Sequence, residues 1–388
     1  MKNKEIQIVY IVSGISRWIS FEWIVEYLHD YPLNIRFILI NSSRYFEKYL
    51  SNQSIEYKII KTKNNIQLLS AIVETVAILM KWKPHVVHTH FRDANIVGLT
   101  AARISGVSKR IHTRHHNTFH HDYARKGVFL DKYSNYLSTD IIAVSKLVKN
   151  TLTEREKTNP LKVHIIHHGF KASLFRNPDP EEVDYLRYKY AIKPHNKVIG
   201  VISRHIYGKG VQYVVKAFKE ILKDYPEAIL FLANAHGSYS VKIKNALRAV
   251  PKKNYRWVAF EPRICSLYSL FDVFVHVPVD EEIEAFGQTY VEAILAGIPS
   301  VFTMSGIAHD FVQHNKNAIV VDHKNDQSIY LAINELLNTR KLNNLKIEEE
   351  GEKVGKLFSF NNMINNLTEI YHNNLSHKLP ETFRYNHK

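Results

Sequence analysis

The segment VFVHVPVDEEIEAFGQTYVEAILAGIPSVFT, residues 273–303, contains a strand, a loop, a helix and a second strand in succession. The apolar run at 273–277 predicts a strand, and an acidic loop follows it. A helical pattern extends over about 288–296 and ends at Gly297, because glycine is common just after a helix. A second apolar run follows at 300–303. Two apolar strands joined through a helix predict a parallel strand pair in an α/β sheet.

The same alternation of short apolar runs and helical patterns extends over most of the 388 residues. The strand candidates of the first half lie at 6–12, 35–40, 57–60, 85–88, 110–113, 141–144 and 163–166. Those of the second half lie at 198–203, 228–233, 256–259, 273–277, 300–303 and 318–321. This alternation predicts an α/β fold with doubly wound, Rossmann-like domains. The continuous apolar runs fit parallel strands that are covered on both faces.

A proline-containing segment, 176–196, interrupts the alternation and predicts the connection between two domains, with a short helix near 183–190. We expect an N-terminal domain of residues 1–178 and a C-terminal domain of residues 183–358. Parallel α/β sheets bind ligands at the carboxyl ends of their strands. Two such domains therefore predict a ligand cleft between them.

The chain carries 52 Lys and Arg against 37 Asp and Glu, a net charge of +15. Between residues 103 and 171 there are thirteen Lys or Arg and five Asp or Glu, an excess of eight positive charges. This excess favours an anionic partner such as an anionic membrane surface, with a solubilising basic face as the alternative. No interleaving of basic and aromatic residues resembles an RNA-binding motif, so nucleic acid is not expected as a partner.

The single cysteine, Cys265, excludes a disulfide within the chain and suits a reducing compartment such as the cytoplasm. The most membrane-like stretch, residues 66–80, is too short to span a bilayer and contains Glu74. Its apolar residues recur at helical spacing, which predicts a packed amphipathic helix. We therefore expect a cytoplasmic protein, and no signal peptide is apparent.

Two carboxylates flank the start of the helix that is predicted at about 288–296. Glu284 ends the preceding loop, and Glu292 lies a little over one turn into the helix. Gly287 permits close backbone approach, and the N–H groups of Gly287, Gln288 and Thr289 lie at the positive end of the helix dipole, where anions bind. A phosphate at the helix start and hydroxyls on the carboxylates would suit a nucleotide sugar. The alternative is an ordinary helix start with acidic residues nearby.

Two cations follow the strand predicted at 198–203. Arg204 and Lys209 lie in the next loop, at the carboxyl end of that strand. Fixed cations at this position can neutralise a departing diphosphate. The alternative is a pair of solvated surface charges.

A series of short motifs occurs in order along nearly the whole chain. They are His85-Val-Val-His-Thr-His90, Ile111-His-Thr-Arg-His115, Ile141-Ile-Ala-Val-Ser145, Ile165-Ile-His-His-Gly169, Ser203-Arg204 with Lys209-Gly210, Glu284-Ala-Phe-Gly287 with Glu292 and Gly297-Ile-Pro299, Ser305-Gly306 with Asn315-Lys-Asn-Ala318, and Phe358-Ser-Phe360. Together they resemble the motifs of the retaining GT-B glycosyltransferases of family 4, also called glycosyl transferases group 1.

The resemblance implies a GT-B fold, in which two Rossmann-like domains face a cleft and a C-terminal helix, about 359–388, crosses back to the first domain. It implies retaining transfer of a hexosyl or N-acetylhexosaminyl group from a nucleotide diphosphate sugar to a glycan or lipid-linked glycan. Synthesis of a cell-surface polysaccharide, such as capsule or lipopolysaccharide, is the expected setting. A lipid-linked acceptor would also fit peripheral contact with an anionic membrane, on the inner face of the plasma membrane.

The resemblance also implies roles for single residues. Arg204 and Lys209 would hold the diphosphate and stabilise the leaving group. Glu284 would contact the hydroxyls of the donor sugar, and Glu292 would accept hydrogen bonds from the ribose. His115 would face the donor sugar from the first domain and completes the expected catalytic set.

Three further positions would shape the donor site. Phe286 and Gly287 would offer backbone groups to the sugar and phosphate, and Gly14 would let the backbone pass close to donor and acceptor. Front-face attack, with the leaving phosphate taking the acceptor proton, would need no covalent enzyme nucleophile. We expect no metal and no cofactor, since the nucleotide sugar is itself a substrate.

Several positions depart from the family pattern. Ser13-Gly14 stands in place of two glycines, Ser203 in place of glycine, His168 in place of asparagine, and Ala308-His309-Asp310 in place of a Pro-Glu pair. None of these departures removes a charged group that the mechanism needs. They bear on the fine shape of the donor pocket.

Histidines at 112, 115, 116, 120 and 121 stand with Asp122 at a spacing that can bind zinc. No second ligand group is placed near them by the sequence, so a cleft histidine is the preferred interpretation. The acidic run 280–282 is interpreted as a solvated loop. Two other functions remain open, a nucleotide-sugar epimerase of the same fold and a non-catalytic nucleotide-sugar-binding subunit.

Overall fold

The computed structural model describes residues 6–15, 19–28, 33–62, 67–338 and 347–373. The chain divides into two compact units. The first unit comprises residues 1–169 and 361–388, and the second comprises residues 170–360. The second unit is therefore inserted, in sequence, between the two parts of the first.

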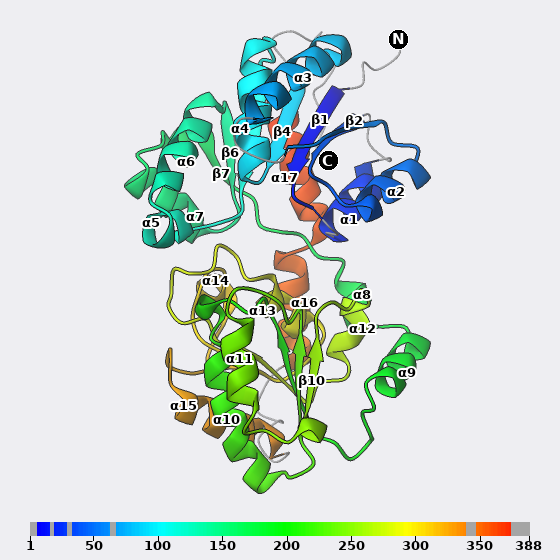
Figure 1. Ribbon diagram of the computed structural model, residues 1–388, viewed down its shortest axis with the longest axis vertical. Helices are drawn as coiled ribbons and strands as arrows, with labels where there is room; N and C mark the ends of the chain where they lie inside the picture. The colour runs from blue at the N-terminus through cyan, green and yellow to red at the C-terminus, as the bar shows by residue number, and fades with distance from the viewer. Residues whose placement is uncertain (1–5, 16–18, 29–32, 63–66, 339–346, 374–388) are drawn as a thin grey trace. The chain divides into compact units, whose positions relative to one another are not determined.

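The first unit is built on a parallel sheet with the strand order β3-β2-β1-β4-β5-β6-β7 (Figure 1). Its strands are β1 (Ile6–Ser13), β2 (Leu33–Ile40), β3 (Tyr57–Ile60), β4 (Val86–His90), β5 (Lys109–Arg114), β6 (Asp140–Ala143) and β7 (Val163–Ile165). The order changes direction between β1 and β4. That point is the topological switch, where loops on the carboxyl side diverge and leave room for a ligand.

Helices surround this first sheet. They are α1 (Ile19–Leu28), α2 (Arg44–Asn52), α3 (Gln67–Trp82), α4 (Arg92–Ile104), α5 (Phe119–Tyr123), α6 (Lys126–Leu137), α7 (Lys146–Asn150), the π-helix η1 (Thr151–Arg155), the 3₁₀-helix η2 (Pro160–Lys162) and, from the end of the chain, α17 (Phe360–His372). The last helix returns to the first unit (Figure 1). There the Tyr371 hydroxyl lies 2.5 Å from the Tyr10 hydroxyl of β1 and 2.8 Å from His88 Nδ1 of β4.

The second unit has its own parallel sheet, with the order β10-β9-β8-β11-β12-β13. Its strands are β8 (Val198–Ile202), β9 (Ile229–Ala233), β10 (Tyr255–Val258), β11 (Val273–His276), β12 (Ser300–Phe302) and β13 (Ile319–Val320). β8, β9 and β11 are buried along their whole length, as their apolar runs require. Here the order changes direction between β8 and β11.

The helices of the second unit lie around this sheet (Figure 1). They are α8 (Ala172–Arg176), α9 (Pro180–Lys189), η3 (Tyr207–Lys209), α10 (Val211–Asp224), α11 (Ser240–Leu247), η4 (Lys252–Asn254), α12 (Ile264–Tyr268), α13 (Gln288–Leu295), α14 (Ala308–Phe311), α15 (Asp326–Leu337) and α16 (Ile347–Leu357). α10 shows how the core forms, because its apolar side, including Val214, Phe218 and Ile221, is buried against the sheet cluster.

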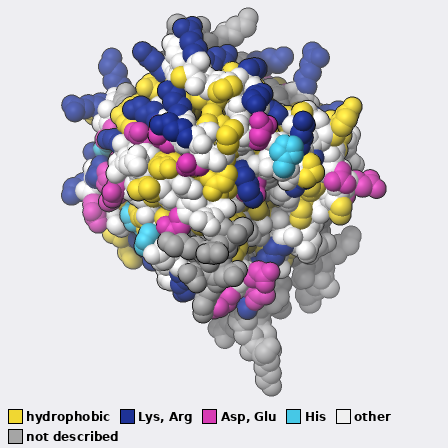
Figure 2. All heavy atoms as spheres, turned by 90° about the horizontal axis from the view of Figure 1, so that it is seen from below, with side chains coloured by type: hydrophobic (Ala, Val, Ile, Leu, Met, Phe, Trp, Pro, Cys, Tyr) yellow, Lys and Arg dark blue, Asp and Glu magenta, His cyan; other side chains and the backbone are white. Residues whose placement is uncertain are grey.

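The predicted fold class, α/β with two doubly wound domains and a C-terminal helix in the first, is confirmed. Of the C-terminal helix predicted at about 359–388, α17 accounts for residues 360–372, and residues 374–388 lie outside the described residues. The predicted strand ends agree with the observed ones to within two residues. No helix in the described part of the chain combines the length and the hydropathy needed to cross a membrane. Lys and Arg side chains are spread over the face seen in Figure 2, so the positive charge is not confined to one tail.

Candidate active site

The switch point of the second unit gathers the cations and carboxylates that the sequence singled out. Arg204 follows β8 with an exposed side chain, and Lys209 ends η3 in the same loop. Glu284 lies in the loop after β11, directly before α13. Because the strands are parallel, their carboxyl ends share one edge of the sheet, which brings these loops together.

Lys209 and Glu284 form an ion pair at this edge. The Lys209 ammonium donates to Glu284 Oε1, and His276 Nε2, at the end of β11, lies 3.2 Å from the same oxygen. Burial works to raise the pKa of Glu284, but Lys209 and His276 outweigh it and hold the pKa below its usual range. Burial lowers the pKa of His276. Glu284 is therefore an ionised carboxylate, ready to accept hydrogen bonds.

Gly210 sets the position of Lys209. Its φ of +71° is a left-handed conformation, and a Cβ there would lie 1.8 Å from the carbonyl oxygen of Val277. Only glycine permits this contact between the loop after β8 and the end of β11. The close approach holds the backbone next to Lys209 against the end of β11.

The start of α13 forms an anion-binding geometry. Gly287 caps the helix with a φ of +85°, and a Cβ there would lie 2.7 Å from the Tyr290 ring. The N–H groups of Gln288 and Thr289, in the first turn, have no acceptor within the helix and carry the positive end of its dipole. Within the described residues, Thr289 Oγ1 is buried without a hydrogen-bond partner. The helix start can thus donate to a bound anion.

Glu292 lies on α13 and is buried. It accepts a hydrogen bond of 2.7 Å from the hydroxyl of Tyr268, at the end of α12. Burial raises the pKa of Glu292 to about 7, with the Tyr268 hydrogen bond acting in the opposite direction. The carboxyl group is therefore close to half ionised at neutral pH. A ligand that donates hydrogen bonds to it would favour the ionised form.

Phe286 lies just before the start of α13, and its side chain is buried. The ring stacks on Phe170 at a centroid distance of 6.3 Å and meets the edge of Phe358 at 5.8 Å. Its carbonyl oxygen accepts from the Ile307 N–H at 2.9 Å. These contacts fix the backbone that leads into the anion-binding helix start.

The switch point of the first unit carries histidines instead of charges. His115, which follows β5, has its Nε2 3.0 Å from Nδ1 of His90, at the end of β4. Its ring stacks on Phe91 at 4.7 Å and on His168 at 5.7 Å. Burial lowers the pKa of His90 and His115 well below the usual range and that of His168 to about 4. The rings are therefore uncharged at neutral pH.

A small cavity of about 40 Å³ lies beside these rings, and Tyr10, Phe21, Thr113 and Met363 are among its lining residues. Gly14, directly after β1, has a φ of +66°, and no described residue has an atom within 4 Å of where its Cβ would be. Its N–H donates to the Ile40 carbonyl at 2.9 Å. Among the described residues, no side chain therefore covers the backbone at Gly14, at the switch point of this unit.

The structure thus brings the candidate residues together in two groups, one in each unit. Arg204, Lys209, Glu284, Phe286, Gly287, Gln288, Thr289 and Glu292 belong to the second unit, and Gly14 and His115 belong to the first. Two buried partners were not predicted from the sequence, His276 beside Glu284 and Tyr268 beside Glu292. His276 carried a signal, because it is a lone polar residue inside an apolar strand. Tyr268 carried none.

One group in the described part of the chain could hold a metal ion. His116, His120 and Asp131 place their ligand atoms within 4.8 Å of one another. The carboxylate is Asp131, not the Asp122 that neighbours the histidines in sequence. The Arg114 guanidinium lies 3.0 Å from the same Asp131 oxygen and already supplies a positive charge there, which disfavours a cation. The switch points carry no comparable group within the described residues.

Comparisons with known proteins agree with this geometry. A model of the glycosyl transferases group 1 matches residues 183–354, and a model of glycosyltransferase family 4 matches residues 41–174. The fold is shared with Anabaena HepE in its crystal structure with UDP and glucose. The TM-score is 0.82 at 17% identity, covering 94% of this chain and 98% of that one. Since such solved structures are glycosyltransferases with the GT-B fold, the predicted fold is confirmed.

Three curated relatives share low identity with the chain. A capsular polysaccharide biosynthesis glycosyltransferase, CapM of Staphylococcus aureus, is 23% identical over 81% of this chain and 84% of its own. An Escherichia coli UDP-Gal:α-D-GlcNAc-diphosphoundecaprenol α-1,3-galactosyltransferase is 21% identical over 88% and 89%. An uncharacterized glycosyltransferase of Methanocaldococcus jannaschii is 24% identical, and the match spans only 62% of its length. With two family models that together cover most of its length, this chain belongs to the family 4, or group 1, glycosyltransferases.

Proposed function

We propose that this protein transfers a sugar, with retention of its anomeric configuration, from a nucleotide diphosphate sugar to a glycan or lipid-linked glycan acceptor. The setting is the synthesis of a cell-surface polysaccharide, carried out on the cytoplasmic side. The observation that carries the proposal is the group at the switch point of the second unit. There, cations, an ionised carboxylate and a free helix start occur together at one sheet edge.

The donor would bind at this group. A diphosphate carries charge that Arg204, Lys209 and the start of α13 are suited to neutralise. Lys209 pairs with Glu284 in the structure, so the diphosphate would draw the ammonium toward itself. Glu284 would then turn its lone pairs to the sugar hydroxyls. Glu292 would accept from the ribose, with Tyr268 holding the carboxylate in place.

The transfer step requires the bond between the anomeric carbon and the diphosphate oxygen to break while the acceptor oxygen bonds to the same carbon. Negative charge grows on the departing diphosphate, and Arg204 and Lys209 would stabilise it in that state. The acceptor hydroxyl proton would pass to a phosphate oxygen on the same face of the sugar. No enzyme nucleophile takes part, and the residues of this site supply the positive charge without a metal ion.

The first unit would contribute uncharged groups. His115, neutral at physiological pH, would donate or accept a hydrogen bond to the donor sugar and would add no charge. Gly14 would let the backbone approach donor and acceptor closely. The names of CapM and of the diphosphoundecaprenol galactosyltransferase support a polysaccharide or lipid-linked acceptor.

The first experiment is a thermal-shift series with UDP, GDP, ADP and dTDP and their sugars, starting with UDP and UDP-glucose because HepE binds them. Stabilisation by one nucleotide family identifies the donor. Transfer is then measured with that donor and glycan or lipid-linked acceptors, and the anomeric configuration of the product is determined by NMR.

The outcomes separate the competing functions. Exchange of a sugar hydrogen with solvent in the absence of acceptor would indicate the epimerase. Nucleotide binding without turnover on any acceptor would indicate a binding subunit. A product of inverted configuration would contradict the retaining mechanism while leaving the transferase assignment intact.

A further inference from the structure

Helix α6 of the first unit buries polar side chains and exposes large aromatic ones. Its buried side carries the polar residues Asp131, Ser134 and Asn135, each at most 6% exposed. Its solvent side carries Phe129 and Tyr136, which are 77% and 78% exposed. A surface helix ordinarily does the reverse. Exposed large apolar side chains beside buried polar ones are the informative exceptions to the usual partition.

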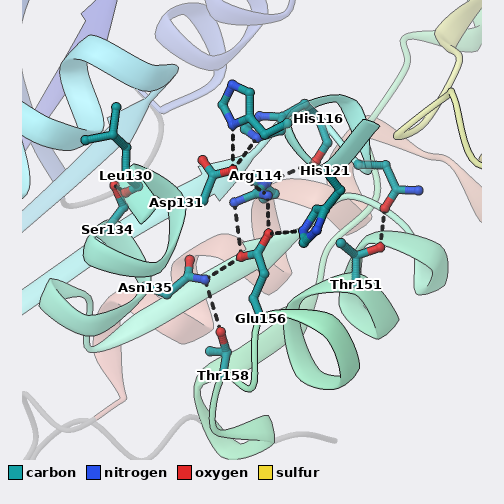
Figure 3. Close-up of polar contacts among 12 residues, drawn as sticks. Arg114, His116, His121, Leu130, Asp131, Ser134, Asn135, Thr151, Glu156 and Thr158 are labelled. Atoms are coloured by element: carbon teal, nitrogen blue, oxygen red, sulfur yellow. Dashed lines mark hydrogen bonds and ion pairs between the residues drawn. The ribbon is translucent and has the colours of Figure 1, made fainter. Parts of the chain in front are cut away.

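A buried ionic network fixes this orientation (Figure 3). Arg114, 2% exposed, lies 3.0 Å from Asp131 and 2.5 Å from Glu156. Asn135 donates to Glu156 at 2.7 Å and to Thr158 at 3.0 Å. Turning α6 to bury its aromatic side would remove Asp131 and Asn135 from this network and leave buried charges without partners. The outward direction of Phe129 and Tyr136 is therefore built into the fold.

A lysine-lined pocket lies beside the aromatic side of α6. Its volume is about 220 Å³, and its lining includes Lys132 and Tyr136 from α6 with Lys157 and Lys162 from the following segment. Glu156 also lines it, but that carboxylate is already paired with Arg114 inside the unit. The pocket consequently offers net positive charge to solvent.

One more exposed apolar side chain neighbours the pocket residue Lys162 in sequence. Leu161, next to Lys162 on η2, is 87% exposed. Aromatic rings, a leucine and lysine ammonium groups are the side chains that enter a lipid–water interface, where apolar parts meet the acyl region and ammonium groups meet phosphate. A purely electrostatic anion site would not need the exposed rings.

We propose that the α6 surface, formed by Phe129, Lys132, Tyr136, Lys157, Leu161 and Lys162, docks the first unit on an anionic phospholipid membrane. A lipid headgroup phosphate would occupy the lysine pocket, and the two aromatic rings and the leucine would enter the interface. Membrane surfaces of this kind attract each nearby lysine. The proposal extends the proposed function, because a lipid-linked acceptor is presented at such a surface, but it is tested without donor or acceptor.

Another exposed apolar row provides a matched control. On α3 of the same unit, Leu69 and Val73 are 68% and 70% exposed, one turn apart. Neither residue lines the lysine pocket beside α6. If exposed apolar area alone caused membrane binding, the two helices would contribute alike.

The test is co-sedimentation of the full chain with vesicles of phosphatidylcholine alone and of phosphatidylcholine with phosphatidylglycerol. We expect binding to the second kind, weakened by salt because the lysine contribution is screened. Phe129→Ser with Tyr136→Ser should lower the partition coefficient at least tenfold. Lys132→Gln with Lys157→Gln should lower it about fivefold per lysine and flatten the salt dependence. Leu69→Ser with Val73→Ser should leave it unchanged.

Thermal unfolding and nucleotide thermal shifts should be the same in all these variants, since the side chains are exposed and lie outside the donor group. Equal binding to both kinds of vesicle, or binding that survives the α6 variants, overturns the proposal. So does loss of binding in the α3 variant alone. Concentration-dependent self-association that the α6 variants abolish would assign this surface to a second copy of the chain. Failure of transfer with intact vesicle binding would count against the proposed function only.

Discussion

The two switch points of this protein have the same strand geometry and opposite electrostatics. In the second unit, Lys209 and Glu284 form a partly buried ion pair beside a free helix start. In the first, His90 and His115 share a hydrogen bond between uncharged rings. Under the proposed function, the charged site would bind the diphosphate, and the uncharged site would contact groups whose charge does not change. The same strand arrangement can therefore carry charged side chains at its switch point in one unit and uncharged side chains in the other.

The largest expected effect comes from removing the charge in the second unit. Lys209→Ala should lower kcat by a factor of about 10²–10³, because a fixed donor to the departing diphosphate is lost. Lys216→Ala on α10, whose side chain is exposed, is the matched control and should be silent. Transfer assays with circular dichroism check both variants. Near-normal activity of Lys209→Ala would remove it from the proposed catalytic set.

Because Glu292 is buried, the free energy of unfolding should depend on pH. Its pKa is raised to about 7 in the folded chain, against about 4.3 in an unfolded one. Between these values the folded state keeps a proton that the unfolded state has lost, so stability falls as pH rises through this window and is lowest above pH 7. Glu292→Gln should recover about 4 kcal/mol at pH 8 and nothing at pH 4.

Denaturant unfolding at both pH values measures this difference, with Tyr268→Phe as a companion that should raise the Glu292 pKa further. The same Glu292→Gln variant should lose donor affinity, because a neutral amide accepts ribose hydrogen bonds less well than a carboxylate. Equal stability of wild type and variant at pH 8 would contradict the raised pKa of the buried carboxyl group. Unchanged donor affinity would contradict its ribose role.

Substitution of His115 should lower activity less than substitution of Lys209, because His115 acts as an uncharged ring. His115→Gln should lower kcat about tenfold, the loss of one hydrogen bond between neutral groups. The wild-type pH–rate profile should show no step from this histidine between pH 5 and 8, since burial keeps the ring uncharged throughout. A step near pH 6.5 that disappears in the variant would mean that a charged imidazole takes part.

The smallest expected effect is on the stability of the first unit. Tyr371→Phe removes a hydroxyl that contacts both Tyr10 and His88 inside the first unit, and should cost about 1 kcal/mol of unfolding free energy. Tyr188→Phe, at an exposed tyrosine of α9, should cost nothing. Nucleotide binding should be unchanged in both, which separates the stability of the first unit from the donor site in the second.

The strands could be predicted well because parallel strands covered on both faces need continuous apolar runs, and β8, β9 and β11 have them. The positions of Arg204, Lys209 and Glu284 on the loops also followed, since each lies just after a strand. Their partners did not. Glu284 pairs with a lysine 75 residues away, and Glu292 with a tyrosine on another helix. Spacing along the chain contains no information on such contacts.

Helix α6 shows a second limit. Apolar periodicity would bury Phe129 and Tyr136, and only the network of Arg114 with Asp131 and Glu156 explains their exposure. The histidine cluster shows the same limit. The carboxylate that His116 and His120 contact is Asp131, not Asp122, which neighbours them in sequence. In both cases the buried Asp131 of α6, paired with the Arg114 guanidinium at the end of β5, decides the local structure.

The discontinuous first unit has a consequence for synthesis on the ribosome. Tyr10 and Tyr371, which meet in its core, are 361 residues apart. The second unit is continuous and can complete its own core as soon as its residues have emerged. The first unit, although its strands are made earlier, must wait for α17. We therefore expect the second unit to finish folding before the first, although the first is translated earlier. Until α17 has been synthesised, the sheet of the first unit stays incomplete and needs protection from aggregation.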